Sequence, residues 1–357
     1  GKGEGEGAGA ILRVSQALGI FCLNRRSQET KRRPRIGWVA VISALLMAGP
    51  ALASEGEDRP MKRRQQGILT GMPFMANLAP RTFVDDLGRK VYLPKTPTRV
   101  VSLAPNITEI LFAIGSGDQV IAVTAFCDYP PEARERQKLG SAHLNLEAIV
   151  GLNPDLVVAP KGFVRPDVLV KLEQLKIKAF VLEAKTIEDI PSHIQTLGRM
   201  LGHSPVADEL ATRMRRDIAE IRERTQQRPR PRLLYVLNSN PLMTVGPGSF
   251  IHQLIELAGG ANVAAGVRTG YPHLNMEEVL KEDPEIIVFP VGATEGIPES
   301  EQQGWLRWQT LSAVKHGRLH RIPSDLLNRP GPRVIQGLES LARIIHPEAY
   351  PEGMGAP

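Results

Sequence analysis

Along residues 81–350, short apolar runs alternate with segments whose apolar residues recur at helical spacing. Three runs typical of buried strands are residues 100–103, 120–125 and 179–182. Residues 106–114 and 169–175 are predicted helices, and residues 82–93 are predicted to form a hairpin. Strands that alternate with helices indicate an α/β lobe with a largely parallel sheet.

A long helix is predicted over residues 206–227, because Leu210, Met214, Ile218 and Ile221 lie close to helical spacing. A second α/β series begins after it, at residues 233–237. The predicted fold is therefore α/β, with two Rossmann-like lobes joined by one long rigid helix. The predicted segments are a first lobe at 81–204, a connecting helix at 205–228 and a second lobe at 229–350.

One stretch of the chain occurs twice. Residues 143–162 align without a gap to residues 273–292, and eight of the 20 positions are identical. Average residue usage would give roughly one or two matches by chance. The identical pairs are His143/His273, Leu144/Leu274, Asn145/Asn275, Glu147/Glu277, Pro154/Pro284, Val158/Val288, Pro160/Pro290 and Gly162/Gly292. A duplicated unit suggests two related lobes that face a shared cleft.

The repeated unit is predicted to be a short helix followed by a buried strand. Asn145 and Asn275 suit a helix N-cap, and Glu147 and Glu277 then fall in the first turn, where the helix dipole favours negative charge. The Asn-Pro and Asp-Pro pairs that follow stop the helix. Ligands of open α/β sheets bind beyond the carboxyl ends of such strands, which predicts a ligand in the cleft between the lobes.

Residues 36–49 form an apolar run of fourteen residues, preceded by four basic residues and followed by Ala51-Leu52-Ala53. This pattern is typical of a secretory signal peptide cleaved after Ala53. The alternative, a transmembrane anchor, would need roughly 20 apolar residues. We therefore expect residues 1–53 to be a leader and residues 54–80 a linker, with residues 351–357 as a tail.

The absence of a cysteine at the cleavage site disfavours a lipid anchor, so a soluble periplasmic protein is expected. Removal of residues 1–53 leaves 44 − 8 = 36 basic and 38 − 3 = 35 acidic residues, a net charge of +1. Such a chain lacks the basic footprint that nucleic-acid binding requires.

No catalytic motif is apparent. The sequence contains no phosphate-binding loop of the Walker type, no His-Glu-x-x-His and no Gly-x-Ser-x-Gly. His316 and His320 are four residues apart but lack a third ligand, so we interpret them as surface histidines and predict no metal site. We therefore expect that the protein is not an enzyme.

Five segments together resemble the iron-siderophore and cobalamin class of periplasmic substrate-binding proteins. They are residues 99–109, 127–133, 145–155, 246–250 and 329–333. The run 127–133 is similar to one found in the corrinoid branch, and the resemblance spans about residues 81–350. It implies two lobes joined by one helix, a cleft that closes slightly, and delivery by a monomer to the permease dimer of an ABC importer.

The resemblance also implies roles for individual residues. A glutamate on each lobe docks onto the permease, and Glu147 and Glu277 match those positions. The alternative is that both are simply first-turn helix carboxylates. A permease dimer with matching charges favours docking.

The ligand implied by the resemblance is a corrinoid such as cobalamin, a large and mostly apolar disc with amide-bearing edges. Matched by position, the residues that would contact it are Phe126, Tyr129, Met243, Tyr271, Asp325 and Arg329. The first four would form walls and the last two would meet the polar edge. Alternatively, Phe126 and Met243 pack in the core. Ser141 departs from the pattern, because well-known cobalamin binders carry tryptophan there.

Three other functions remain open. A ferric-siderophore or haem carrier would call for clustered cations, whereas Arg165, Arg268 and Arg329 are scattered along the chain. His143 or His273 could ligate cobalt or haem iron. A corrinoid-processing periplasmic enzyme would need a nucleophile and base, and a purely structural interaction protein would need no cleft.

Overall fold

The computed structural model describes residues 81–140, 145–292 and 296–350, all of which belong to one compact unit. The predicted leader, linker and tail, as well as Ser141 and His143, lie outside the described residues. In the part of the chain that is described, no helix is both long and apolar enough to cross a membrane.

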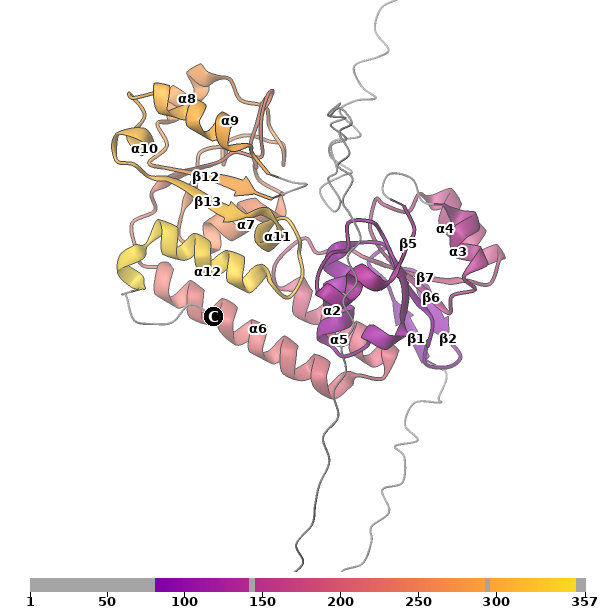
Figure 1. The fold of residues 1–357 in the computed structure, drawn as a ribbon. Coiled ribbons are helices and arrows are strands. Elements are labelled where there is room, and N and C mark those ends of the chain that lie inside the picture. The colour runs from indigo at the N-terminus through magenta and orange to yellow at the C-terminus, as the bar shows by residue number, and fades with distance from the viewer. Residues whose placement is uncertain (1–80, 141–144, 293–295, 351–357) are drawn as a thin grey trace, which may run out of the picture. The chain divides into compact units, whose positions relative to one another are not determined.

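The first lobe is built on a parallel five-stranded sheet with the strand order β5-β4-β3-β6-β7. Strands β5, β6 and β7 of this sheet are labelled in Figure 1. Its strands are β3 (Val100–Ser102), β4 (Val120–Val123), β5 (Gln137–Lys138), β6 (Leu156–Pro160) and β7 (Lys178–Leu182). Alternate strand residues pack into different cores, since Val157 and Ala159 contact one apolar cluster and Leu156 and Val158 another. Both faces of the sheet are therefore covered, as in a doubly wound fold.

The helices of the first lobe follow its strands. They are α2 (Pro105–Ala113), α3 (Leu146–Gly151), α4 (Pro166–Gln174) and α5 (Asp189–Leu201), with the 3₁₀ turns η1 (Gly117–Gln119) and η2 (Pro131–Glu135). The predicted hairpin is confirmed as β1 (Arg81–Val84) paired antiparallel with β2 (Lys90–Leu93). Gly88 supplies its turn with a φ of +76°, a conformation that glycine adopts without a steric cost.

The second lobe holds a parallel four-stranded sheet with the order β11-β8-β12-β13. These strands are β8 (Arg232–Tyr235), β11 (Ala261–Asn262), β12 (Ile286–Val291) and β13 (Leu319–Pro323), and a small hairpin joins β9 (Asn238–Ser239) to β10 (Leu242–Met243). The helices are α7 (Phe250–Leu257), α8 (Met276–Glu282), α9 (Glu299–Gln303), α10 (Ser312–Lys315), α11 (Ser324–Leu327) and α12 (Val334–Ile345), with η3 (Gly304–Arg307) and η4 (Pro347–Ala349). The predicted α/β class with largely parallel sheets is confirmed.

The long helix is α6 (Ser204–Thr225), slightly displaced from the predicted 206–227. It packs against α5, α7 and α12, and its buried residues belong to an apolar cluster that also contains one face of each sheet. Leu156 of the first lobe and Val288 of the second are both members of this cluster. Helix α6 is thus part of a core that both lobes share, in addition to being the connection between them.

The two copies of the repeated unit adopt the same local structure. The side chain of Asn145 accepts a hydrogen bond from the backbone N–H of Ala148 at 3.0 Å, and that of Asn275 accepts one from Glu278 at 2.9 Å. Asn153 and Asp283 then end the helices in the left-handed region, with φ of +45° and +43°. Each unit continues into a buried strand in the interior of its sheet, β6 or β12.

An arginine at or directly before the start of the neighbouring strand, β3 or β8, binds the end of the helix in each copy of the unit. Arg99 donates to the carbonyl oxygens of Leu152 and Asn153, at the end of α3. Arg232 donates in the same way to Glu282 and Asp283, at the end of α8. These bonds satisfy carbonyls that a helix end leaves unpaired. The predicted duplication is therefore visible in backbone conformation as well as in sequence.

Helices α5 and α6 are in close contact at Gly198, and we expect this contact to tolerate no larger side chain. A Cβ at Gly198 would lie 2.2 Å from the Cβ of Ala207. The Gly198→Ala substitution should lower the free energy of unfolding by about 1–3 kcal/mol, because the helices must separate. Urea denaturation would measure this. Gly304→Ala is the control, since a Cβ there meets no atom within 4 Å, and equal stability of the two variants would contradict the expectation.

Candidate functional site

The segment after β4 and the segment after β13 meet across the two lobes. The guanidinium NH1 of Arg329 lies 2.6 Å from Oδ1 of Asp128. Each residue follows the carboxyl end of a parallel strand, which is where open α/β sheets bind ligands. The candidate site is therefore the place where the carboxyl edges of the two sheets are joined.

Arg329 is almost entirely buried, with 6% of its side chain exposed, and three carboxylates surround it. NH1 lies 2.6 Å from Asp128 and 3.5 Å from Glu109, and NH2 lies 3.0 Å from Asp325. Burial disfavours its charge, but the hydrogen bond to Asp128 and the three carboxylates outweigh burial and raise the pKa of Arg329. The Nε–H has no partner among the described residues.

A second arginine of the same segment reaches into the first lobe. Arg333 donates from Nε to Oε2 of Glu109 at 2.9 Å and from NH2 to Oε1 at 2.6 Å, which is a bidentate pair. Its guanidinium carbon also lies 3.9 Å from the ring centroid of Tyr129, a cation–π contact. Burial raises the pKa of Glu109 in spite of its arginine partners.

The backbone between the two arginines lies close to helix α2. The carbonyl of Pro330 accepts a hydrogen bond from Nδ2 of Asn106 at 3.4 Å. A Cβ at Gly331 would lie 3.3 Å from the carbonyl oxygen of Asn106, so a larger residue would push the segment away. Glycine at this position therefore permits the approach that brings both arginines to Glu109.

The residues matched to the ligand fall into two groups. Tyr129, Asp325 and Arg329 belong to the charged network, and half-buried Phe126 precedes Tyr129 by three residues. Met243 and Tyr271 lie on neighbouring segments of the second lobe, where Met243 bridges to His273. Burial raises the pKa of Tyr271 to about 12, so its phenol is neutral at physiological pH. Their contact with a ligand stays a prediction.

Sequence reasoning assigned no role to Glu109, Asp128 and Arg333, although all three occur in the segments that resemble the family. A sequence signal for this network exists: Glu109 is the only charged residue of helix α2, most of whose other residues are apolar, and a buried charge needs a partner. Two arginines spaced four apart in residues 329–333 were the available partners. Nothing in the local pattern linked the two, because they are separated by more than 200 residues.

The two glutamates predicted to dock lie at equivalent exposed positions. Glu147 and Glu277 occupy the first turns of α3 and α8. Within the described ranges, neither carboxylate takes part in an ion pair or hydrogen bond. The neighbouring Glu278, in contrast, accepts a hydrogen bond from the backbone N–H of Asn275 at 2.8 Å and closes a capping box. Of the two adjacent acids, Glu277 is therefore the one free to meet a partner.

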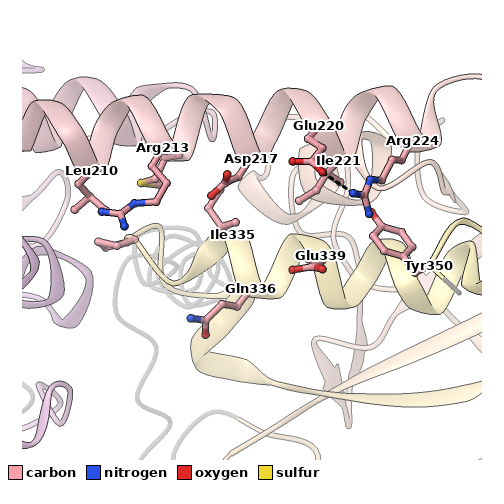
Figure 2. A pocket seen from close by; sticks show the side chains of 12 residues that line it. Leu210, Arg213, Asp217, Glu220, Ile221, Arg224, Ile335, Gln336, Glu339 and Tyr350 are labelled. Atoms are coloured by element: carbon pink, nitrogen blue, oxygen red, sulfur yellow. Dashed lines mark hydrogen bonds and ion pairs between the residues drawn. The ribbon is translucent and has the colours of Figure 1, made fainter. Parts of the chain in front are cut away.

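A groove of about 330 Å³ lies between α6 and α12 (Figure 2). Its walls are apolar residues such as Leu210 and Ile335 together with charged residues, among which Glu220 pairs with Arg224. None of the residues matched to the ligand lines this groove. Over residues 81–140, 145–292 and 296–350, no group of three His, Cys, Asp or Glu side chains is placed to hold a metal ion.

Comparisons with known proteins agree with this architecture. A family model described as "Periplasmic binding protein" matches residues 100–326. The vitamin B12-binding protein of Vibrio cholerae is 31% identical over 250 residues, which cover 70% of this chain and 89% of that protein. An ABC transporter substrate-binding lipoprotein of Bacillus subtilis is 28% identical over 90% of this chain and 100% of its own length.

Solved structures show the same fold. The periplasmic vitamin B12 binding protein of Vibrio cholerae matches with a TM-score of 0.64 and 30% identity, over 72% of this chain and 99% of that chain. A periplasmic haem-binding protein from Pseudomonas aeruginosa matches with a TM-score of 0.62 over 71% and 95% of the two chains. At 23% identity, the second likeness bears on the fold alone.

Acidification is expected to weaken the tie between Asp128 and Arg329. Burial acts to raise the pKa of Asp128, but the hydrogen bond and charge of Arg329 prevail and hold it below its usual 3.8. Such a carboxyl contributes stability above its unfolded pKa and loses that contribution as the pH falls through its folded pKa. The wild type should therefore exceed Asp128→Asn in free energy of unfolding at about pH 6, and the difference should shrink towards about pH 3.

Urea denaturation at the two pH values would measure this difference. It should stay below about 1 kcal/mol, because the Asp128 side chain is 47% exposed and water screens the pair. A difference that does not change with pH would contradict the expectation.

Proposed function

Since this chain belongs to the periplasmic binding protein family, we propose that it captures a corrinoid and delivers it to an ABC importer in the inner membrane. The observation that carries the proposal is the position of Tyr129, Asp325 and Arg329, which gather where the carboxyl edges of the two sheets are joined. The relative from Vibrio cholerae that is named a vitamin B12-binding protein is 31% identical over 70% of this chain, which supports the same class of ligand.

The chemistry of the site suits a corrinoid. Its flat, apolar faces require aromatic or thioether walls, for which we propose Phe126, Tyr129, Met243 and Tyr271. Its amide-bearing edges need both a donor and an acceptor. We propose that Asp325 supplies carboxylate oxygens for amide N–H groups, and that an amide carbonyl of the ligand would pair with the buried Nε–H of Arg329, which has no partner among the described residues.

The charge balance favours this ligand over a ferric siderophore or haem, the second candidate. Solved structures of the fold include haem-binding proteins, and an anionic chelate or propionate would require unpaired cations. Here the two guanidinium groups of Arg329 and Arg333 meet three carboxylates, those of Glu109, Asp128 and Asp325. With no surplus positive charge, this cluster is better matched to neutral amides.

We further propose that the protein holds its ligand without transforming it. The described residues near the site offer no nucleophile beside a base. Cys127 is buried, accepts a hydrogen bond from Thr108 at 3.2 Å, and has a pKa raised by burial, which disfavours the reactive thiolate. Capture and release are then the whole activity.

Delivery to the permease would use the first turns of α3 and α8, one on each lobe. Glu147 and Glu277 occupy the same position of the same unit, one on each lobe, and both are exposed. A permease dimer would offer two related basic sites to such a pair. We propose that the exported chain acts as a soluble periplasmic monomer after removal of residues 1–53, since Ser54 follows the expected cleavage site where a lipid anchor would need cysteine.

Direct titration tests the ligand. Calorimetry of residues 54–357 with cyanocobalamin should show one site, and Tyr129→Ala should weaken binding by about tenfold through loss of an aromatic wall. Tyr92→Ala is the matched control, because Tyr92 is 49% exposed and Tyr129 is 44% exposed. Binding of haem and not of cyanocobalamin would replace the proposal with its second candidate.

Uptake assays test the delivery. In cells that carry the matching importer, Glu147→Ala/Glu277→Ala should abolish most corrinoid uptake, while purified double variant retains wild-type affinity for cyanocobalamin. Glu173→Ala/Glu282→Ala is the control, since both residues are exposed helix glutamates outside the first turns. Unchanged uptake with the first pair would reduce Glu147 and Glu277 to helix-start carboxylates.

A further inference from the structure

The carboxylate of Glu109 is buried, which is unusual for a charged group. It lies on α2 between Thr108 and Ile110, and 2% of its side chain is exposed. Removing a carboxylate from water costs several kcal/mol unless other groups compensate. Glu109 must therefore be explained by what it binds.

The charged partners of Glu109 are two arginines of the other lobe. Arg333 makes two hydrogen bonds to it, at 2.9 and 2.6 Å, and Arg329 lies 3.5 Å away. Bidentate pairing between a planar guanidinium and a planar carboxylate depends on direction as well as distance. A change in the angle between the lobes would break at least one of these bonds.

The same two arginines organise the candidate ligand site. Arg333 lies over the ring of Tyr129 at 3.9 Å, and Arg329 holds Asp128 at 2.6 Å. Tyr129 and Asp128 are adjacent residues on the segment after β4. Glu109 thus fixes two guanidinium groups, and these in turn fix the aromatic residue and the polar edge.

We propose that Glu109 is a positioning residue for the ligand site. It sets the separation of the lobes and the orientation of Tyr129 and Arg329 together, without contacting the ligand. The inference deepens the proposed function, because affinity for a corrinoid is one of its two measurements. Its other measurement needs no ligand.

The test compares Glu109→Gln with Asp85→Asn. Asp85 is a matched control, since it is also buried and accepts two hydrogen bonds from one arginine, Arg89, at 3.0 and 2.6 Å. Its network lies wholly within the first lobe. Both substitutions should lower the melting temperature, because each replaces a buried carboxylate that pairs with a guanidinium by a neutral amide.

The two variants should differ at the site. Glu109→Gln should weaken cyanocobalamin binding at least about tenfold, whereas Asp85→Asn should stay within about twofold of the wild type. Without ligand, Glu109→Gln should also speed amide hydrogen exchange in residues 126–129 and 329–333, and Asp85→Asn should not. If Glu109→Gln keeps wild-type affinity and wild-type exchange in these segments, or if Asp85→Asn changes both as much as Glu109→Gln does, the proposal is overturned.

Two further variants keep the test decisive if Glu109→Gln does not fold. Arg333→Lys retains the charge but lacks the planar fork, so it should show part of the loss in affinity and part of the faster exchange. Glu109→Gln/Arg333→Gln removes both charges of the bidentate pair, so neither is left buried without the other, and it should still show weaker cyanocobalamin binding and faster exchange. Wild-type behaviour of either variant would count against the proposal.

The outcomes separate this inference from the proposed function. A wild type that does not bind cyanocobalamin refutes the proposed ligand. The exchange comparison between Glu109→Gln and Asp85→Asn then still decides whether Glu109 organises residues 126–129 and 329–333.

Discussion

A carboxylate of the first lobe and two guanidinium groups of the second form the contact on which the arrangement of the site depends. Glu109, Arg329 and Arg333 are each largely removed from water, so none is stable there without the others. The geometry they demand is narrow, because a fork of two donors must face two acceptors in one plane. The close approach of Gly331 to α2 belongs to the same constraint, since it permits the arginines to reach their partner.

Each of the two lobes that this contact joins contains one copy of the repeated helix–strand unit. An asparagine cap starts a short helix, a left-handed residue before proline ends it, and a buried strand in the interior of each sheet follows. The copies are not identical, because Glu278 closes a capping box in the second and Ala148 occupies that position in the first. What both retain is an exposed first-turn glutamate, a feature that capping alone does not require.

Many helices and strands of the two lobes could be predicted from the sequence, because helix caps, prolines that end helices and apolar runs are local signals. Asn145, Asn275 and the strands after them were recognisable for that reason, and the long helix was evident from its spacing. Helix α5 was not predicted, and neither was its approach to α6 at Gly198, which depends on tertiary contact. The charged network could not be predicted either, because Glu109 and Arg333 are 224 residues apart and the periodicity of apolar residues carries no information over that separation.

The shared core has a consequence for the order in which this chain gains its structure. One apolar cluster includes Val91 near the start of the first lobe and Ile345 near the end of the last helix. Contacts of such long sequence separation form late, after most of the loop-closure entropy has been spent. The cluster that contains Val101 and Leu172 lies wholly within the first lobe and can close by itself. The cluster that both lobes share closes only when α12 packs against α6, so the two sheets reach their final arrangement only after the last helix has been synthesised.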